Sequence, residues 1–303
     1  NLVAKDSSIA LIEAESPSQI RDEFEFYGLS VVCTNPQTDS YADYRCDFEL
    51  WEVDSGFLMY IGCNVTYSDY FDDGTLRTFL TYGIDRQSLV DNNYGGLALP
   101  TTLPISPMSP YYSKSLAATY DYDEMRFIDA ASKLRVPTND KGVTRTLKLL
   151  VNSDDSARLR CARNIAATLT ELGLACETVE SPTSVYEARL QAANYDIYLG
   201  ITKLPATADL SEFFRPWGEM SWGGLANETI YTMVKQSLAD RGNYYNLHKL
   251  VEDNGHIIPV MAGYYAIYAK RGVLSDLNPA RDNVFYYTLG KTMESSKVAT
   301  QFS

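Results

Sequence analysis

The sequence has few of the residues that build metal centres and disulfide frameworks. Two histidines and five cysteines occur among 303 residues, and the cysteine spacings contain no CxxC pair. His248 and His256 stand eight residues apart, which is not the spacing of metal ligands on one helix face. An odd cysteine count leaves at least one unpaired, and we expect most of them to be small buried residues. We therefore expect neither a bound metal nor a cofactor.

Short catalytic motifs are missing as well. The sequence contains no GxSxG elbow, no GxxxxGK[ST] loop, no HExxH and no GxGxxG. Carboxylates are abundant, but nothing in their spacing selects one pair for acid–base work. The absence of these motifs favours a binding protein over an enzyme.

Basic residues are outnumbered by acidic ones, and the formal net charge is -13. A nucleic-acid partner is disfavoured, because affinity for phosphates comes largely from Lys and Arg. No apolar run approaches the ~20 residues that span a bilayer. The first sixteen residues lack the basic start and apolar core of a signal peptide, and the first residue is not Met. We expect a processed or truncated chain.

The clearest structural unit lies in the middle of the chain. Apolar strand patterns alternate there with helical patterns that begin with acids and end with glycine. The strands are expected at 145–151, 174–179 and 195–201, with helices at 154–173 and 184–194. This alternation predicts a parallel β-α-β-α-β arrangement. Ligands of such sheets bind beyond the carboxyl ends of the strands, which nominates the loops Asn152–Asp155 and Thr202–Asp209.

Other elements flank this unit. Strands are expected at 29–34, 45–53, 56–64 and 256–270, and helices at 76–84, 227–239 and 245–255. Asp72 or Asp73 is the expected cap of the helix at 76–84. The Asp85–Arg86 pair at its end is expected to be structural, with Arg86 bonding carbonyl groups.

The stretch YIGCNVTYSDYFDDGTLRTFLTYGIDRQSLV resembles the signature of the family 5 extracellular solute-binding proteins, the dipeptide, oligopeptide and nickel-type binding proteins of ABC importers. The matching positions are Asn64, Phe71, Asp72, Arg77, Ile84, Asp85 and Arg86. The likeness continues in order through YGGLALPTTLPISPMSP, YDYDEMRFIDAASKL and the central strand–helix–strand, and covers residues 57 to 275.

The resemblance implies a two-lobed, periplasmic-binding-protein-like class II α/β fold that closes on a ligand at a hinge. Residues 57–275 are similar to the second lobe, residues 1–56 to a remnant of the first lobe, and residues 276–303 to a return segment toward the hinge and first lobe. The chain is thus expected to be a C-terminal fragment of such a protein.

A glycine-rich segment, ADLSEFFRPWGEMSWGGLAN, offers aromatic and polar groups for one wall of a ligand site. The expected ligand-binding residues are Asn64, Asp209, Trp217, Trp222 and Asn227, with no catalytic residue. Phe213 and Phe214 are more readily explained by packing. Peptide-binding members place an Asp near the position of Ala206 or Thr207, and Asp209 is shifted from it.

The resemblance implies capture of a peptide or other small solute outside the cell membrane. The implied partners are the ligand and an ABC permease. A lipid anchor in the full-length protein would hold the protein at the membrane surface; otherwise it would lie in the periplasm. An alternative is the ligand-sensing domain of a transcriptional regulator with a similar module.

Overall fold

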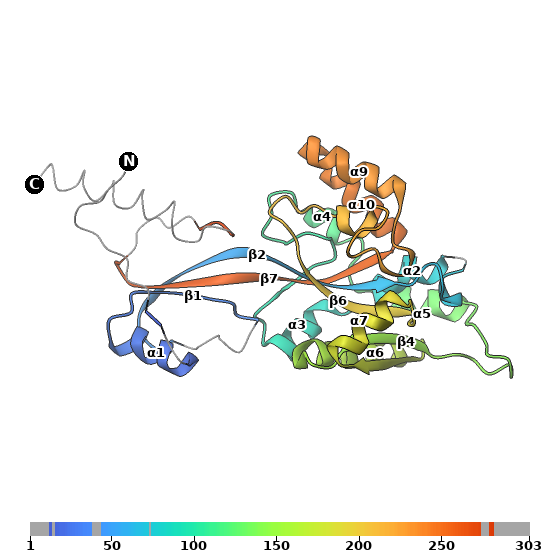
Figure 1. Cartoon of the computed structure of the whole chain (residues 1–303), viewed down its shortest axis with the longest axis horizontal. Helices are drawn as coiled ribbons and strands as arrows, with labels where there is room; N and C mark the ends of the chain where they lie inside the picture. Colours follow the sequence, from blue (N-terminus) through green and yellow to red (C-terminus); the bar gives the residue numbers. More distant parts are fainter. Residues whose placement is uncertain (1–11, 14–15, 38–43, 73, 274–278, 282–303) are drawn as a thin grey trace, which may run out of the picture. The chain divides into compact units, whose positions relative to one another are not determined.

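The computed structural model describes residues 12–13, 16–37, 44–72, 74–273 and 279–281, and the helices and strands are labelled in Figure 1. The chain divides into two compact units, one formed by residues 1–55 with 263–303 and the other by residues 56–262. Each unit is described separately. The predicted return segment 276–303 lies outside the described residues except for 279–281.

Unit 1 contains α1 (Pro17–Phe26), β1 (Val31–Thr34), the first part of β2 (Phe48–Cys63) and the last part of β7 (Ile257–Lys270). Strand β1 pairs antiparallel with β7, with Val31 opposite Ala269. Aromatic rings fill the space beside this pair: the rings of Phe24 and Tyr44 lie 4.7 Å apart, and Tyr44 lies 4.7 Å from Tyr268. Sequence patterns predicted β1 correctly but gave no sign of this cluster.

Unit 2 is a three-layer α/β structure. Its strand order is β7-β2-β6-β4-β5, with β3 paired to β7. The remaining strands are β3 (Leu99–Pro100), β4 (Leu147–Asn152), β5 (Cys176–Ser181) and β6 (Ile197–Lys203). β4 pairs parallel with β5 and with β6, while β6 pairs antiparallel with β2. The parallel β-α-β-α-β prediction for the middle of the chain is therefore confirmed.

Helices cover both faces of this sheet. One side carries η1 (Asp69–Phe71), α2 (Thr75–Phe79), η2 (Leu80–Gly83), α3 (Arg86–Tyr94), α5 (Glu124–Lys133) and α6 (Ser156–Glu171). The other carries α4 (Lys114–Ala117), α7 (Thr183–Gln191), α8 (Ser211–Phe214), η3 (Trp222–Gly224), α9 (Glu228–Ala239), η4 (Arg241–Asn243) and α10 (Tyr244–Asn254). In Figure 1, α9 and α10 run side by side, as their contacts require.

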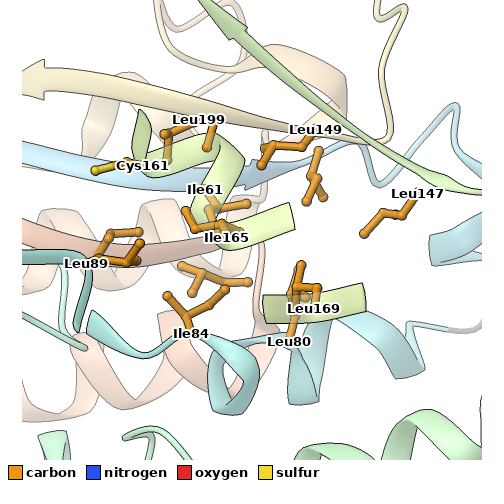
Figure 2. Close-up of a cluster of buried hydrophobic side chains, with 14 of the residues drawn as sticks. Ile61, Leu80, Ile84, Leu89, Leu147, Leu149, Cys161, Ile165, Leu169 and Leu199 are labelled. Atoms are coloured by element: carbon orange, nitrogen blue, oxygen red, sulfur yellow. The ribbon is translucent and has the colours of Figure 1, made fainter. Parts of the chain in front are cut away.

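The sheet residues alternate between two cores, as strand geometry requires. On the α6 side, Leu147 and Leu149 of β4 pack with Ile165 and Leu169 of α6 (Figure 2). On the α7 side, Leu150 packs in a second core that includes residues of α7, α8, α9 and α10. Burial of each such side chain contributes about 1.5–3 kcal/mol to folding.

Of the five cysteines, which are all free, Cys63 and Cys161 are buried.

Two local predictions need correction. The strands expected at 45–53 and 56–64 form one strand, β2, because Gly56 accommodates a φ of 79° that lets the strand continue. The helix expected at 76–84 is a short α-helix followed by a 3₁₀ turn, and its N-cap is Gly74 rather than Asp72. Asp73 lies outside the described residues.

The Asp85–Arg86 pair is structural, as expected, and Arg86 bonds carbonyl groups. Asp85 caps the start of α3 by accepting a bond from the Ser88 backbone at 3.0 Å. The Arg86 guanidinium is buried and donates to the backbone oxygens of Pro259, Thr81 and Ile84 and to the Thr81 hydroxyl. Arg86 thereby ties α3 to β7.

A second buried ionisable group lies on α10. His248 is fully buried, and within the described part of the chain neither of its ring nitrogens has a hydrogen-bond partner. Burial lowers the pKa of His248 to about 4, because the imidazolium ion would lose its hydration. One turn further, burial raises the pKa of Glu252 well above its ordinary value, although Arg86 opposes the shift. The interior of unit 2 thus holds His248 as a neutral ring.

We predict that His248 makes the stability of unit 2 pH-dependent. Its folded pKa is depressed below 6.5, so its contribution is present above pH 6.5 and is lost as pH falls toward 4. Replacing it by Phe, which keeps the ring beside Tyr244, should remove about 2 kcal/mol of the stability loss between pH 7.5 and pH 5.0 in urea unfolding. Tyr245→Phe on the exposed face of α10 is the control. Equal pH slopes for His248→Phe and the parent would contradict the prediction.

Candidate functional site

The carboxyl ends of the parallel strands define one edge of the unit 2 sheet. We call residues 152–155, 181–183 and 203–209 the carboxyl edge, since β4 ends at Asn152, β5 at Ser181 and β6 at Lys203. Lys203 pairs with Phe57, so this edge lies level with the start of unit 2 in β2. Loops at this kind of edge carry the ligand sites of open α/β sheets.

Two turns of the carboxyl edge are bonded to each other. The Asn152 amide donates to the Thr183 hydroxyl at 3.0 Å, and the Thr183 backbone N–H donates to the Asp154 carboxylate at 2.8 Å. The Thr183 hydroxyl also donates to Asp154 at 2.7 Å. These bonds, the backbone one foremost, lower the pKa of the Asp154 carboxyl. The starts of α6 and α7 are therefore fixed side by side.

The loop after β6 is also fixed. The hydroxyl of Tyr244 donates to the backbone oxygen of Thr207, and its ring stacks on Tyr111 with centroids 5.0 Å apart. Ala208 adopts a φ of 49°, a conformation that few residues other than glycine accept. Asp209 lies on this loop, and one of its carboxylate oxygens accepts the backbone N–H of Ser211 at 2.8 Å. Among the predicted ligand-binding residues, Asp209 is the one that the carboxyl edge contains.

Asn64 lies at the opposite edge of the sheet, where β2 ends and β6 begins. Its side chain is fully buried, and its amide donates to the backbone oxygens of Ala193 at 2.9 Å and Tyr195 at 2.8 Å. Its oxygen accepts the backbone N–H of Tyr67 at 3.1 Å. These contacts give Asn64 a structural role that joins the end of β2 to the start of β6.

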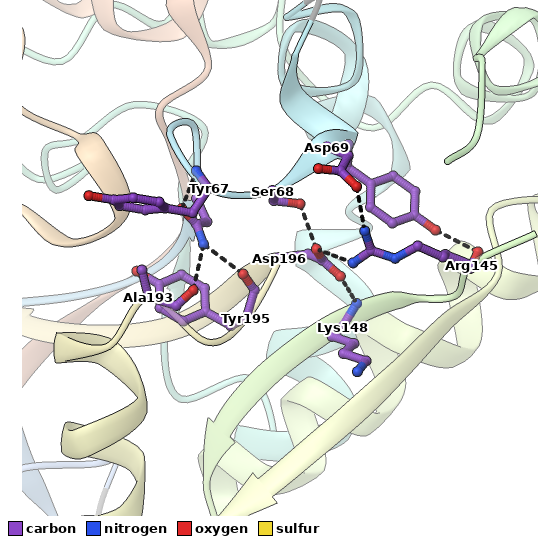
Figure 3. Close-up of polar contacts among 10 residues, drawn as sticks. Tyr67, Ser68, Asp69, Arg145, Lys148, Ala193, Tyr195 and Asp196 are labelled. Carbon is purple, nitrogen blue, oxygen red and sulfur yellow. Dashed lines mark hydrogen bonds and ion pairs between the residues drawn. The ribbon is translucent and has the colours of Figure 1, made fainter. Parts of the chain in front are cut away.

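The buried Asp196 carboxylate reinforces this edge, and the sequence gave no signal for it. It accepts the Ser68 hydroxyl at 2.5 Å and the Lys148 backbone N–H at 2.9 Å (Figure 3). Arg145 lies 3.5 Å from it and pairs with Asp69 at 2.8 Å. Asp196 therefore connects the starts of β4 and β6 to the segment that follows β2.

Trp222 lies at this same edge rather than beyond the carboxyl end of β6. The neighbouring Gly223 has a φ of 60° and lies so close to Asn64 that an added Cβ would come within 2.9 Å of its Cα. Gly224 is equally close to Thr66. The Trp222 ring is half-buried against the α7-side core. The segment between the end of β6 and Trp222 therefore runs back along the sheet, from the carboxyl edge to the edge that holds Asn64.

Trp217 is held out to solvent. Its side chain is 94% exposed, and its φ of 60° is rare for a bulky residue. The preceding turn is fixed by Arg215, which donates two hydrogen bonds to Glu212 at 2.9 and 2.8 Å. An exposed indole on an ordered but strained turn is a candidate for contact with a ligand or partner.

The last predicted residue, Asn227, caps a helix. Its oxygen accepts the backbone N–H of Ile230 at 3.0 Å at the start of α9, and its own backbone N–H donates to Phe214 at 2.9 Å. Phe213 and Phe214 are buried in the α7-side core, in agreement with the packing explanation. Asn227 is thus occupied by local structure.

Sequence reasoning missed one charged residue beside the carboxyl edge. Arg158 lies in the first turn of α6, with 6% of its surface exposed, and its guanidinium lies over the ring of Tyr186 at 5.3 Å. Its position, three residues after an acidic loop, was the available signal.

Within the described part of the chain, no cluster of three or more His, Cys, Asp or Glu side chains could hold a metal ion. None of the helices described is both long and apolar enough to cross a bilayer.

The fold and the ordered loops at its strand ends define a binding-protein type of α/β domain. The sequence profile of the bacterial extracellular solute-binding proteins, family 5 (middle) matches residues 30–224, and the chain belongs to this family. No curated protein matches the chain.

Solved structures show the same fold at low sequence identity. A putative peptide binding protein AppA from Clostridium difficile gives a TM-score of 0.67 at 16% identity over 85% of this chain and 55% of that one. The oligopeptide-binding protein AppA from Bacillus subtilis, in complex with a nonapeptide, gives 0.63 at 15% over 90% and 57%. NikA from Brucella suis, in complex with Fe(III)-EDTA, gives 0.65 at 13% over 88% and 58%. The chain spans little more than half the length of these structures.

We predict that Asn64→Ala destabilises unit 2 by about 3 kcal/mol, because two buried carbonyls and one N–H lose their partner. The exposed Asn92→Ala in α3 is the control and should change stability by less than about 0.5 kcal/mol. Urea unfolding of both variants measures this. Unchanged stability of Asn64→Ala together with lost solute binding would instead assign Asn64 to the ligand.

Proposed function

We propose that the protein is the solute-capturing component of an ABC importer and binds a peptide or another small solute outside the cell membrane. The observation that carries the proposal is membership of the extracellular solute-binding family over residues 30–224. The absence of a catalytic motif in the sequence is compatible with it. The proposed role is binding and delivery, with no chemical change of the solute.

The proposed ligand-contacting surface of unit 2 is its carboxyl edge. Its loops are fixed before any ligand arrives, by Thr183 on one side and by Tyr244 on the other. A fixed surface loses little conformational entropy on binding, which raises affinity. Asp209 is proposed to contact the solute with the carboxylate oxygen that Ser211 does not use. Trp217 is proposed as an aromatic contact on account of its exposure.

No ligand role is proposed for Asn64 or Asn227, whose polar groups are bonded within unit 2. Trp222 stays part of the proposal through the part of its ring that the α7-side core leaves uncovered. The proposal includes solutes other than peptides. Ala206 and Thr207 occupy the place where peptide-binding members of the family have an Asp that pairs with the α-amine of the ligand. The Thr207 carbonyl is already bonded to the Tyr244 hydroxyl.

The proposed partner is the importer's permease, with the protein at the outer face of the membrane or in the periplasm. A lipid anchor on the full-length protein would keep it near that permease. The proposal is tested by native mass spectrometry of the full-length protein from its host, followed by uptake of the recovered solute in cells with and without the gene. A protein that carries no solute, in cells whose uptake of peptides and other small solutes is unchanged by deletion of the gene, would contradict it.

The two tryptophans give a prediction that separates contact from packing. Trp217→Ala should leave the melting temperature unchanged, because the indole is exposed, and should weaken solute binding by about 1–3 kcal/mol if it covers the solute. Trp222→Ala should lower the melting temperature, because its ring packs on buried residues. Intrinsic fluorescence and calorimetric titration with the recovered solute measure both. Parent-like affinity of Trp217→Ala would remove Trp217 from the site.

A further inference from the structure

A cavity opens between α3 and α6, on the α6 side of unit 2, and we call it the α3–α6 groove. Its volume is about 370 Å³, and it is lined by residues within 83–92 and 164–171 and by Tyr122. Cavities of this size hold small molecules in other proteins. Glu171, at the end of α6, lies about 24 Å along the helix axis from Asp155 at its start, at ~1.5 Å per residue. The groove is therefore a different place from the carboxyl edge.

The polar side chains that line the groove lie on one face of each helix, because they recur at helical spacing. They are Asp85, Ser88 and Asn92 at α3, and Asn164, Thr168 and Glu171 on α6. The Asn164 amide donates to the Asn93 side-chain oxygen at 3.3 Å, which ties the two helices together at one point. The short side chains of Ser88 and Ala167 leave the space beside this bond unfilled.

The bottom of the groove is apolar. Ile84, Leu89 and Ile165 line it and belong to the α6-side core, where Figure 2 labels them. All three are buried, so they form the floor of the groove rather than its rim. A ligand with an apolar body would displace water from this floor, which favours binding.

The charges of the groove have one sign. Among the described residues that line it, Asp85 and Glu171 are acidic and none is basic. Within the described part of the chain, neither carboxylate makes an ion pair, whereas Asp129 of the neighbouring α5 pairs with Lys133 at 2.7 Å. Arg86 follows Asp85 in the chain, but its guanidinium is buried and bonded to backbone oxygens. The groove thus presents negative charge without a counter-charge of its own.

The ring of Tyr122 lies where the two carboxylates meet. Burial raises the pKa of its hydroxyl, and three carboxylates raise it further, because a second negative charge nearby is disfavoured. These carboxylates belong to Glu124, Asp85 and Glu171. Asp85 and Glu171 therefore act on one phenol from two different helices.

A second tyrosine of the same side shows what Tyr122 lacks. The guanidinium of Arg126 lies over the ring of Tyr82, at 3.7 Å from its centroid. No cation of the described residues lies over the ring of Tyr122. A cation is attracted to an aromatic face as well as to a carboxylate. The groove accordingly offers both kinds of cation-binding group and contains no cation from the described chain.

We propose that the α3–α6 groove binds a small organic cation, with an ammonium or guanidinium group between Asp85, Glu171 and the ring of Tyr122 and an apolar body on the floor. Carboxylates bind such groups through charge-assisted hydrogen bonds, and the aromatic face adds a cation–π contact. A bare metal ion is a poorer match, because it would leave the apolar floor uncovered. The site is additional to solute capture, and its ligand would link α3 with α6.

The first test titrates the full-length protein with phenethylammonium, which joins an ammonium group to an apolar ring, and with phenethyl alcohol, its neutral counterpart. Isoleucine methyl groups are labelled with ¹³C, and the signals of Ile84, Ile165 and Ile230 are assigned with Val variants. The signals of Ile84 and Ile165 should shift saturably with phenethylammonium and not with the alcohol. Ile230, in the α7-side core, is the control and should not shift. The absence of a saturable shift, or equal shifts with the alcohol, overturns the proposal.

The second test compares two variants that remove the same charge. Asp85→Asn/Glu171→Gln should keep the fold, because Asn caps a helix as Asp does, and should reduce affinity for phenethylammonium at least about tenfold. Asp91→Asn/Glu177→Gln removes two exposed carboxylates outside the groove and should keep the parent affinity. Parent affinity of the first variant, or an equal loss in the second, overturns the proposal. Both tests measure signals of the groove itself, so their results do not depend on whether solute capture is correct.

Discussion

The register between β2 and β6 is the constraint on which unit 2 depends. Tyr60 of β2 lies opposite Gly200 of β6, and Tyr198 of β6 lies opposite Gly62 of β2. A Cβ at Gly62 would come within 2.2 Å of the Tyr198 ring, and one at Gly200 within 2.6 Å of the Tyr60 ring. Each large ring thus occupies the space that a glycine leaves open across the strand pair. A shift of either strand by one residue would turn that strand's ring to the other face of the sheet.

Both edges of the sheet follow from this register. It sets Lys203 level with Phe57, so that the carboxyl ends of the parallel strands meet where unit 2 begins. It sets Cys63 level with Ile197, which brings Asn64 to the turn before β6 and Asp196 to Ser68. One edge therefore holds the buried polar side chains of Asn64 and Asp196, while the other holds the starts of α6 and α7 and Arg158. The difference between the two edges is a property of the strand pairing.

The sequence predicted the central unit well because its signals are local. Alternating strand and helix patterns, with Asp155 as a cap and Gly173 as a stop, are sufficient to predict parallel strands around α6 and α7. The candidate site was harder to predict because its placement depends on distant segments. Trp222 follows β6 in the chain but lies beside Asn64, since the intervening residues travel back along the sheet. Arg158 could not be distinguished from Arg163 by sequence, because only the folded structure buries one of them and leaves the other exposed.

The division of the chain has a consequence for synthesis on the ribosome. Unit 2 is one continuous stretch, whereas unit 1 is built from segments that precede and follow it. Among the described strands, β1 pairs with the far end of β7, where Val31 meets Ala269. Chains emerge from the amino end and domains fold as units. The first segment must therefore wait without its strand partner until all of unit 2 has been made, and this delay exposes an unpaired strand edge that chaperones are suited to protect.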